Sequence, residues 1–446
     1  MTTETAAFAG QCERVVREGC RAVVTDVGDG MAAESTGARG ERLTAGAAGF
    51  ETTKKRVLFV DDEPRVLDGL RRSLRGKRNE WDMAFATSGA QALELLAESR
   101  CDVVVSDMRM PGMDGAELLT HVSERHPEVA RIVLSGHTEQ EAAIRVAVAG
   151  HRFLTKPSDV GSVVAAVEQL THRTSAAHGA AVRRLAGAVR SLPTLPAHVG
   201  RLTAVWGAAD VEVAEAALVA SRDIGFTAKL LQLSNSVFFG ARARVTSAES
   251  AINALGLPTV QALVNSGHLL WSSERWGPAV ERELDVVWRH AVATARLVGL
   301  MASPANRPYA QAAALLQDIG WLVGLAQTRS NPDPAVDLTA VGGQGPTHRE
   351  VGVELLHLWG LPYPIVAAVA ERDLQHRPRS SGLGVAAAVR AAHLLIQRTD
   401  ARGLRLGTHD DELAELLTHP QLTAASTDWR RAAEEVSEQA GQSSAR

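Results

Sequence analysis

The stretch VVVSDMRMPGMDG, residues 103–115, decides the fold of the first half of the chain. Apolar residues run directly into Asp107, and a Pro-Gly turn then leads into a new helical pattern. A short apolar run of this kind is typical of a buried strand in a parallel sheet. Open α/β sheets place their functional residues at the carboxyl ends of such strands. Taken alone, Asp107 could be a metal ligand, a nucleophile or a helix cap.

The succession of strand, turn and helix repeats between residues 54 and 171. Apolar runs predict strands at residues 57–60, 83–87, 102–106, 131–134 and 152–154. Apolar residues at helical spacing follow each run, the fourth set through Ile144 and Val148. This alternation predicts an α/β doubly wound, five-stranded parallel sheet that carries helices on both faces.

The chain that follows is predicted to be helical. Residues 172–190 place Val182, Leu185 and Val189 on one stripe, which predicts a helical linker. Residues 191–397 show almost no strand pattern and predict an all-α domain, for which the motifs quoted below carry a resemblance to HD-like helical domains. Two of its helices are expected to break near Asp223. Further helices are expected at 247–255, 258–270, 284–301, 309–325 as a single helix, 347–359 after a Thr-x-x-Glu capping box, and 384–397.

Both ends of the chain differ in composition from the middle. Residues 1–53 are rich in Ala, Gly, Thr and Glu and lack a sustained apolar period. They predict a disordered extension, or an assigned start that lies upstream of the true one. Residues 398–446 form a polar tail that is expected to be partly helical and to add nothing to a core.

Composition narrows the class of protein. A length of 446 residues predicts two or three domains, and a formal charge of -4 offers no basic field for nucleic acid or anionic lipid, although a local basic patch stays open. Cys12, Cys20 and Cys101 have no CxxC spacing, which argues against a disulfide framework or a thiolate zinc site. No apolar run reaches the ~18 residues of a membrane span, and the N-terminus lacks a leader pattern. We therefore expect a cytoplasmic protein without a membrane anchor.

Polar side chains follow the predicted strands where each strand ends. Asp61 and Asp62 follow the first strand, Asp107 the third, Ser135 the fourth and Lys156 the fifth. Three carboxylates at one rim favour a hard divalent cation, for which Mg²⁺ is the expected choice. A hydroxyl and an ammonium opposite them suit the oxygens of a phosphoryl group. The simplest chemistry is an aspartyl phosphate with Asp107 as the nucleophile.

Four separated motifs in this half resemble the receiver domains of two-component response regulators: VDDEP, SDMRMPGMDG, LSGHTE and FLTKP. The resemblance implies that a sensor histidine kinase phosphorylates Asp107. It also implies that Asp62, assisted by Asp61, and the backbone carbonyl of Arg109 hold Mg²⁺ together with Asp107. Ser135 and Lys156 would reach the phosphoryl oxygens, and Phe153 would be the aromatic switch that moves inward.

Each of these residues also has an ordinary structural interpretation. Asp61 or Asp62 could cap the helix that starts near Pro64, and Lys156 could be a solvated surface charge. Ser135 could be a loop residue. Phe153 could be an aromatic of the core.

The second half resembles the HDOD family, a degenerate branch of the HD phosphohydrolases, through SLPTLP, TAKLLQLSNSVFFG, AINALGLPTVQALV, WRHAVATA, ALLQDIG and THREVGVELLHLWGLP. A catalytic HD site uses a lone His, a His-Asp pair and a distant Asp. Here His290 matches the lone His, but the pair reads Gln317-Asp318 and His393 stands near the place of the distant Asp. A neutral amide is a poor metal ligand. The resemblance therefore implies a non-catalytic domain that acts through an unidentified protein partner.

Alternatives remain for this half. His290 could be a hydrogen-bonded helix histidine or a ligand, and Asp318 is expected to cap or bond local backbone. The main rival function is a metal-dependent HD-type phosphohydrolase that acts on a nucleotide or cyclic dinucleotide under receiver control. Nucleic-acid binding lacks a recognised groove-reading motif. The sequence leaves open whether the chain forms a homodimer.

Overall fold

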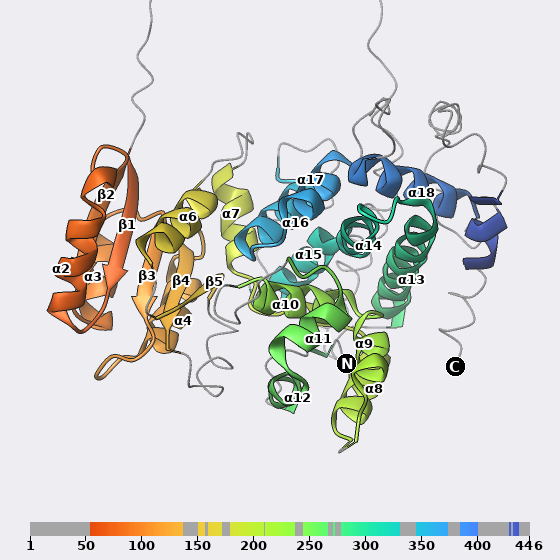
Figure 1. The fold of residues 1–446 in the computed structure, drawn as a ribbon, viewed down its shortest axis with the longest axis horizontal. Coiled ribbons are helices and arrows are strands. Elements are labelled where there is room, and N and C mark those ends of the chain that lie inside the picture. Colours follow the sequence, from red (N-terminus) through yellow and green to blue (C-terminus); the bar gives the residue numbers. More distant parts are fainter. Residues whose placement is uncertain are drawn as a thin grey trace, which may run out of the picture.

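The computed structural model describes residues 54–136, 150–156, 159–171, 179–208, 210–236, 244–265, 271–272, 278–330, 345–372, 384–399, 428–429 and 431–436. Figure 1 shows a sheet with flanking helices at one end of the molecule and a wholly different, helical body at the other. The predicted extension 1–53, the helix through Ile144 and Val148, residues 172–178 of the linker and most of the tail lie outside the described residues.

The first domain is built on a parallel sheet in the order β2-β1-β3-β4-β5. Its strands are β1 (Lys55–Val60), β2 (Trp81–Ala86), β3 (Val103–Asp107), β4 (Ala130–Ser135) and β5 (Arg152–Thr155). Every residue of β3 and β4 is buried, as their apolar sequences require. The strand order reverses between β1 and β3, so their carboxyl ends flank the point where such sheets bind ligands.

Helices cover this sheet: α2 (Pro64–Ser73), α3 (Gly89–Glu98), α4 (Gly115–Arg125) and α6 (Val160–Thr171), with a short 3-10 turn η1 (Arg75–Lys77). Ser88 caps α3 and Asp114 caps α4 through their side chains. Helices α3 and α4 pack together, whereas Lys77 after α2 pairs with Glu168 of α6. The predicted α/β doubly wound fold is confirmed.

The linker helix α7 (Gly179–Gly187) lies between the two bodies, next to α6 and α16 (His348–Leu358) in Figure 1. Its predicted apolar stripe, Val182 and Leu185, is buried, as is Val189 beyond its end. The linker therefore packs as part of the structure and is not a free tether.

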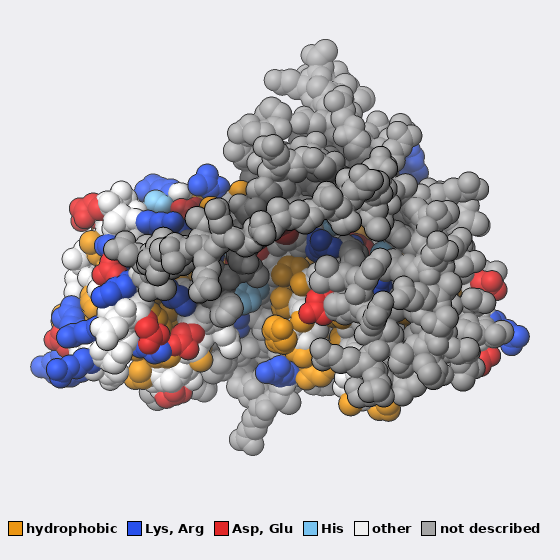
Figure 2. Space-filling model, turned by 90° about the horizontal axis from the view of Figure 1, so that it is seen from above, with side chains coloured by type: hydrophobic (Ala, Val, Ile, Leu, Met, Phe, Trp, Pro, Cys, Tyr) orange, Lys and Arg blue, Asp and Glu red, His pale blue; other side chains and the backbone are white. Residues whose placement is uncertain are grey.

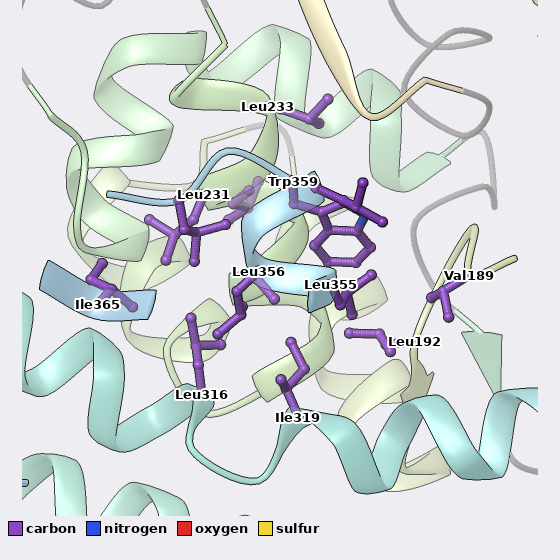
Figure 3. Packing of buried hydrophobic residues seen from close by; sticks show 14 of the residues in the cluster. Val189, Leu192, Leu231, Leu233, Leu316, Ile319, Leu355, Leu356, Trp359 and Ile365 are labelled. Atoms are coloured by element: carbon purple, nitrogen blue, oxygen red, sulfur yellow. The ribbon is translucent and has the colours of Figure 1, made fainter. Parts of the chain in front are cut away.

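The second body is helical, as predicted, and α16 begins with the expected capping box of Thr347 and Glu350. Its core gathers Leu231, Leu316, Ile319, Leu355 and Trp359 from several helices (Figure 3). The other helices are α8 (Pro196–Trp206), α9 (Val213–Ala220), α10 (Ile224–Ser234), α11 (Ala248–Leu255), α12 (Leu257–Asn265), α13 (Pro278–Met301), α14 (Arg307–Leu316), α15 (Ile319–Ser330), α17 (Tyr363–Glu371) and α18 (Val385–Thr399).

Three local expectations were wrong. The single helix predicted over 309–325 is two helices, because the chain turns at Gln317 and Asp318 between α14 and α15. A side chain at Gly320 would overlap the carbonyl of His348, so close packing of α15 on α16 sets the break.

A short parallel pair, β6 (Pro193–Thr194) and β7 (Trp271–Ser272), occurs where almost no strand pattern was seen. The tail also contributes to the core through Trp429, Ala433 and Val436.

No helix among the described residues is both long and apolar enough to cross a bilayer. In the face drawn in Figure 2, basic and acidic side chains are intermixed over the described surface of the sheet domain. This face therefore shows no large basic patch on its described residues.

Candidate functional site

Asp107 ends β3 and stands at the carboxyl rim of the sheet, 8% exposed. The loop after it folds back tightly: the Met108 amide donates to Leu134, and the Gly115 amide donates to Met108. A side chain at Gly115 would overlap the carbonyl of Asp107, so only glycine lets α4 start this close to the strand. Met108 and Met110 are buried, which anchors the loop and holds the Asp107 carboxylate in place.

The ammonium of Lys156 lies between two carboxylates. Its Nζ is 2.5 Å from Asp107 Oδ1 and 2.7 Å from Asp61 Oδ2. Burial would lower the pKa of Lys156, but hydrogen bonds to Asp107 and Asp61 outweigh it and raise that pKa above its ordinary value. Lys156 therefore stays charged and neutralises a pair of buried acids.

The remaining carboxylate oxygens are held by backbone amides. Asp61 Oδ1 accepts from the Glu63 amide at 3.0 Å, and Asp107 Oδ2 accepts from the Arg109 amide at 3.1 Å. These bonds fix the orientation of both acids and bring the Arg109 peptide next to Asp107. The pair is preorganised before any ligand arrives.

Ser135 and Phe153 flank this pair on β4 and β5. Ser135 is buried at the end of β4, and its carbonyl accepts from the Lys156 amide at 2.8 Å. Phe153 is paired in register with Val133 and is 5% exposed, so it is buried. A side chain at Gly150 would press on the Phe153 ring.

Asp62 is half-buried and is not drawn into the contact that Asp61 and Asp107 share. Among the residues that the structure describes, no three His, Cys, Asp or Glu side chains are grouped to hold a metal. The expected cluster of three carboxylates is here two carboxylates around an ammonium. Asp61 and Asp107 nevertheless direct one oxygen each at a single cation, and oxygen ligands are those that Mg²⁺ prefers, so the donor set fits that ion.

The residues expected at a degenerate HD centre meet inside the helical body. His290 Nε2 lies 2.9 Å from His393 Nδ1, with their rings edge to face. Asp318 accepts a hydrogen bond from Arg372 NH1 at 2.6 Å. The Gln317 side chain is buried, and neither of its polar atoms has a hydrogen-bond partner among the described residues.

The Asp318 side chain forms an ion pair with Arg372 across the domain, and its carbonyl, directly before α15, accepts from the Trp321 amide. Burial would raise the pKa of Asp318, but the charge of Arg372 prevails, with His290 and His393 adding to it, and lowers that pKa to about 2. Arg372 comes from the end of α17, 54 residues away. A guanidinium thus occupies the environment of the one carboxylate in this centre.

Sequence reasoning missed a third polar cluster, where the two bodies meet. Arg131 of β4 is fully buried. Its NH2 group donates to the carbonyl of Gly187 at 2.7 Å and also lies 2.8 Å from His151 Nε2. Gln232 of α10 joins it from the helical body. The available signal was an arginine inside the apolar strand ARIVLS, since a buried cation needs dedicated partners.

Comparisons with known proteins agree with these two halves. A family model of the response regulator receiver domain matches residues 57–168, and a model of the HDOD domain matches residues 192–375. The DNA-binding transcriptional regulator NtrC of Escherichia coli K12 is 38% identical over 116 residues, which cover 25% of this chain and 24% of NtrC. The hydrogenase transcriptional regulatory protein HoxA of Cupriavidus necator is 43% identical over 103 residues, with coverage of 23% and 21%.

Among solved structures, the signal receiver domain of an HD domain-containing protein from Pseudomonas fluorescens Pf-5 is 30% identical. The match covers 26% of this chain and 86% of the Pseudomonas fluorescens chain, with a TM-score of 0.25. The chain spans about a quarter of the length of the curated relatives it matches, 24% for NtrC. The two family models, matched in this order, show that the chain carries a response regulator receiver domain followed by an HDOD domain.

Proposed function

We propose that Asp107 is the phosphoryl acceptor of this response regulator, that a sensor histidine kinase is the donor, and that the HDOD domain is a non-catalytic output. The observation that carries the proposal is the Lys156 ammonium held between Asp61 and Asp107 at the switch point of the sheet. A cationic group next to a carboxylate nucleophile is what the transfer of a negatively charged phosphoryl group requires.

In the transfer, an Asp107 oxygen attacks the phosphorus of a phosphohistidine, the phosphorus–nitrogen bond breaks, and the imidazole leaves with a proton from solvent. Asp107 is presented by β3 and aligned by the Arg109 amide. Lys156 would neutralise the oxygens of the new acyl phosphate, and the Ser135 hydroxyl would donate to them. Mg²⁺ held by Asp61, Asp62, Asp107 and the Arg109 carbonyl would add charge neutralisation.

The HDOD half acts in this proposal by binding another protein. At its centre Gln317 stands where a ligand histidine would be, and Arg372 already neutralises Asp318. His290 and His393 contact each other. A metal ion entering here would have to displace a buried ion pair and approach a guanidinium, which is electrostatically unfavourable.

The test is labelling of the full chain by acetyl phosphate in the presence of Mg²⁺. Asp107→Asn should abolish incorporation, because the amide is a poor nucleophile. The matched control is Asp114→Asn in the same loop, since asparagine caps α4 as well as aspartate does and should leave labelling unchanged. Equal labelling of the Asp107→Asn protein would overturn the assignment.

The same purified chain also tests the output. A non-catalytic HDOD domain should contain no stoichiometric iron, manganese or zinc when its metal content is measured. Stoichiometric metal that is lost in a His290→Ala variant would favour the rival function, a metal-dependent phosphohydrolase of nucleotides or cyclic dinucleotides.

A further inference from the structure

The HDOD domain holds the receiver at the amino end of β5. Gln232 Nε2 of α10 lies 3.1 Å from the carbonyl of Gly150 and 3.4 Å from that of His151, and it donates to both. The next residue, Arg152, donates to the carbonyl of His357 at 3.2 Å. Three consecutive receiver residues are therefore bonded to two HDOD helices.

The contact of Arg152 with α16 is reciprocal. Arg152 reaches the last turn of α16, where the backbone carbonyls and the helix dipole favour a cation. In return His357 Nε2 donates to the carbonyl of Gln169 in α6 at 2.6 Å. Gly360, just beyond α16, leaves room for the Arg152 guanidinium, which any side chain there would displace.

The opposite end of the same strand carries Lys156. Strand β5 has only four residues, Arg152–Thr155. The contacts with the HDOD domain therefore lie at its amino end, and Lys156, which contacts Asp61 and Asp107, directly follows its carboxyl end. Phe153 lies between them. Among the described strands β5 is an edge of the sheet and is paired only with β4. Fewer ladder bonds restrain it than restrain β3, so it can shift without breaking the sheet.

We propose that β5 couples phosphorylation to HDOD docking: a phosphoryl group on Asp107 draws Lys156 away from Asp61, shifts β5, and loosens the hold of Gln232 and α16 on residues 150–152. This rests on the proposed function of Asp107. The structure has Lys156 bound to both acids and the HDOD domain docked, which is the arrangement of the unphosphorylated protein in this scheme.

Coupling is reciprocal, so weaker docking must favour the phosphorylated form. The probe is beryllofluoride with Mg²⁺, a mimic of the phosphoryl group, titrated into the full chain. Gln232→Leu removes the amide that donates across the interface and leaves every receiver residue unchanged. It should tighten binding of the mimic by about 5-fold or more, the lower end of typical allosteric coupling.

The matched control is Gln261→Leu in α12. The Gln261 side chain also donates to two backbone carbonyls, those of Trp206 and Ala208, but both belong to the HDOD domain. This variant should bind the mimic with unchanged affinity. Equal affinities for the wild type and both variants would overturn the coupling while leaving the acceptor role of Asp107 intact.

Hydrogen exchange of the wild type gives a second readout that needs no variant. The Gly360 amide donates to the same His357 carbonyl that accepts from Arg152, so exchange at the end of α16 reports on docking. Beryllofluoride with Mg²⁺ should speed exchange there and not in α13, which lies at the far side of the HDOD domain in Figure 1. Binding of beryllofluoride without faster exchange at the end of α16 would contradict the coupling. A wild type that takes up neither mimic nor acetyl phosphate label would overturn the proposed function and this inference together.

Discussion

Lys156 is the residue on which the electrostatics of the receiver site depend. It is the cation that Asp61 and Asp107 share, and both acids are buried. Without it, two carboxylates would face each other in a site of low dielectric constant, where like charges repel strongly. The lysine therefore stabilises the site before phosphorylation as well as serving the chemistry.

Replacing Lys156 with methionine should lower the free energy of unfolding by about 1–3 kcal/mol in EDTA, because two buried acids lose their counter-charge. Added Mg²⁺ should recover part of the loss. Urea denaturation with and without Mg²⁺ measures both. Lys77→Met is the comparison, since Lys77 also contacts two carboxylates, Glu80 and Glu168, but at the surface, and its removal should have little effect. Equal losses in the two variants would contradict this account.

For single residues, the sequence predicted that the acids and the lysine lie at neighbouring strand ends. It did not predict that Lys156 pairs with Asp61 and Asp107. Strand periodicity identifies which residues lie at the rim, whereas the choice of Asp61 over Asp62 as the partner of Lys156 depends on side-chain direction. The pairing of Asp318 with Arg372 was also beyond the sequence, because α14 and α17 come together only through tertiary packing.

At the scale of elements, the strands were predictable because their apolar runs are short and bounded, and the capping box of α16 because it is local. The break between α14 and α15 was not, since it follows from the contact of Gly320 with α16. Helices α8 and α17 were not expected either. Both begin with proline near their first turn, a start signal without a strong apolar period behind it.

The end of α16 offers a test of how two elements fit together. Gly360 has a φ of 80°, and a side chain there would also collide with Arg152. Gly256 has a similar φ of 83°, but its nearest neighbours leave room for a methyl group. Both Gly→Ala variants should lose about 1–2 kcal/mol from backbone strain.

Gly360→Ala should lose about 1–3 kcal/mol more than Gly256→Ala, because the Arg152 guanidinium must move aside and give up its hydrogen bond to the His357 carbonyl. Thermal denaturation of the two proteins measures the difference. A double variant of Gly360→Ala with Arg152→Ala should remove this excess, since the colliding guanidinium is gone. Identical losses in the two single variants would mean that the receiver does not rest on α16 in solution.

At the scale of the whole molecule, the interface between the domains is rich in buried cations. Burial, with Arg131, Arg183 and Lys229 adding to it, lowers the pKa of His151 well below 6.5. Burial, with Arg131 adding to it, lowers the pKa of Lys229 to about 7, although the Trp359 ring and the Arg190 carbonyl favour its charged form. Sequence could not predict this interface, because no periodicity reports which surfaces of two domains meet.

These shifts predict that stability rises with pH. Below about pH 6.5 His151 binds a proton in the unfolded chain but not in the folded chain, because its pKa is lowered on folding. Between about pH 7 and 10.5 the unfolded chain keeps a proton on Lys229 that the folded chain has released. The unfolding free energy should therefore increase from pH 5.5 to 9, measured by urea denaturation at each pH.

The Lys229→Met variant separates the two contributions. It should flatten the rise above pH 7 and leave the part below pH 6.5, which belongs to His151. A wild-type curve that falls between pH 7 and 9, or a variant curve with the same slope there, would show that Lys229 is not buried at the interface.

The burial of Arg131 also bears on how this chain can be divided. A receiver fragment that ends at residue 171 would lose the Gly187 carbonyl that accepts from Arg131 and the Gln232 amide that donates to Gly150 and His151. In that fragment the carbonyls of Gly150 and His151, just before the edge strand β5, would be exposed to other molecules, and Arg131 on β4 would lose one of its carbonyl acceptors. Such a fragment should self-associate more readily than one that extends through residue 190. The smallest piece that behaves as an independent receiver is therefore longer than the segment whose sequence defines the family.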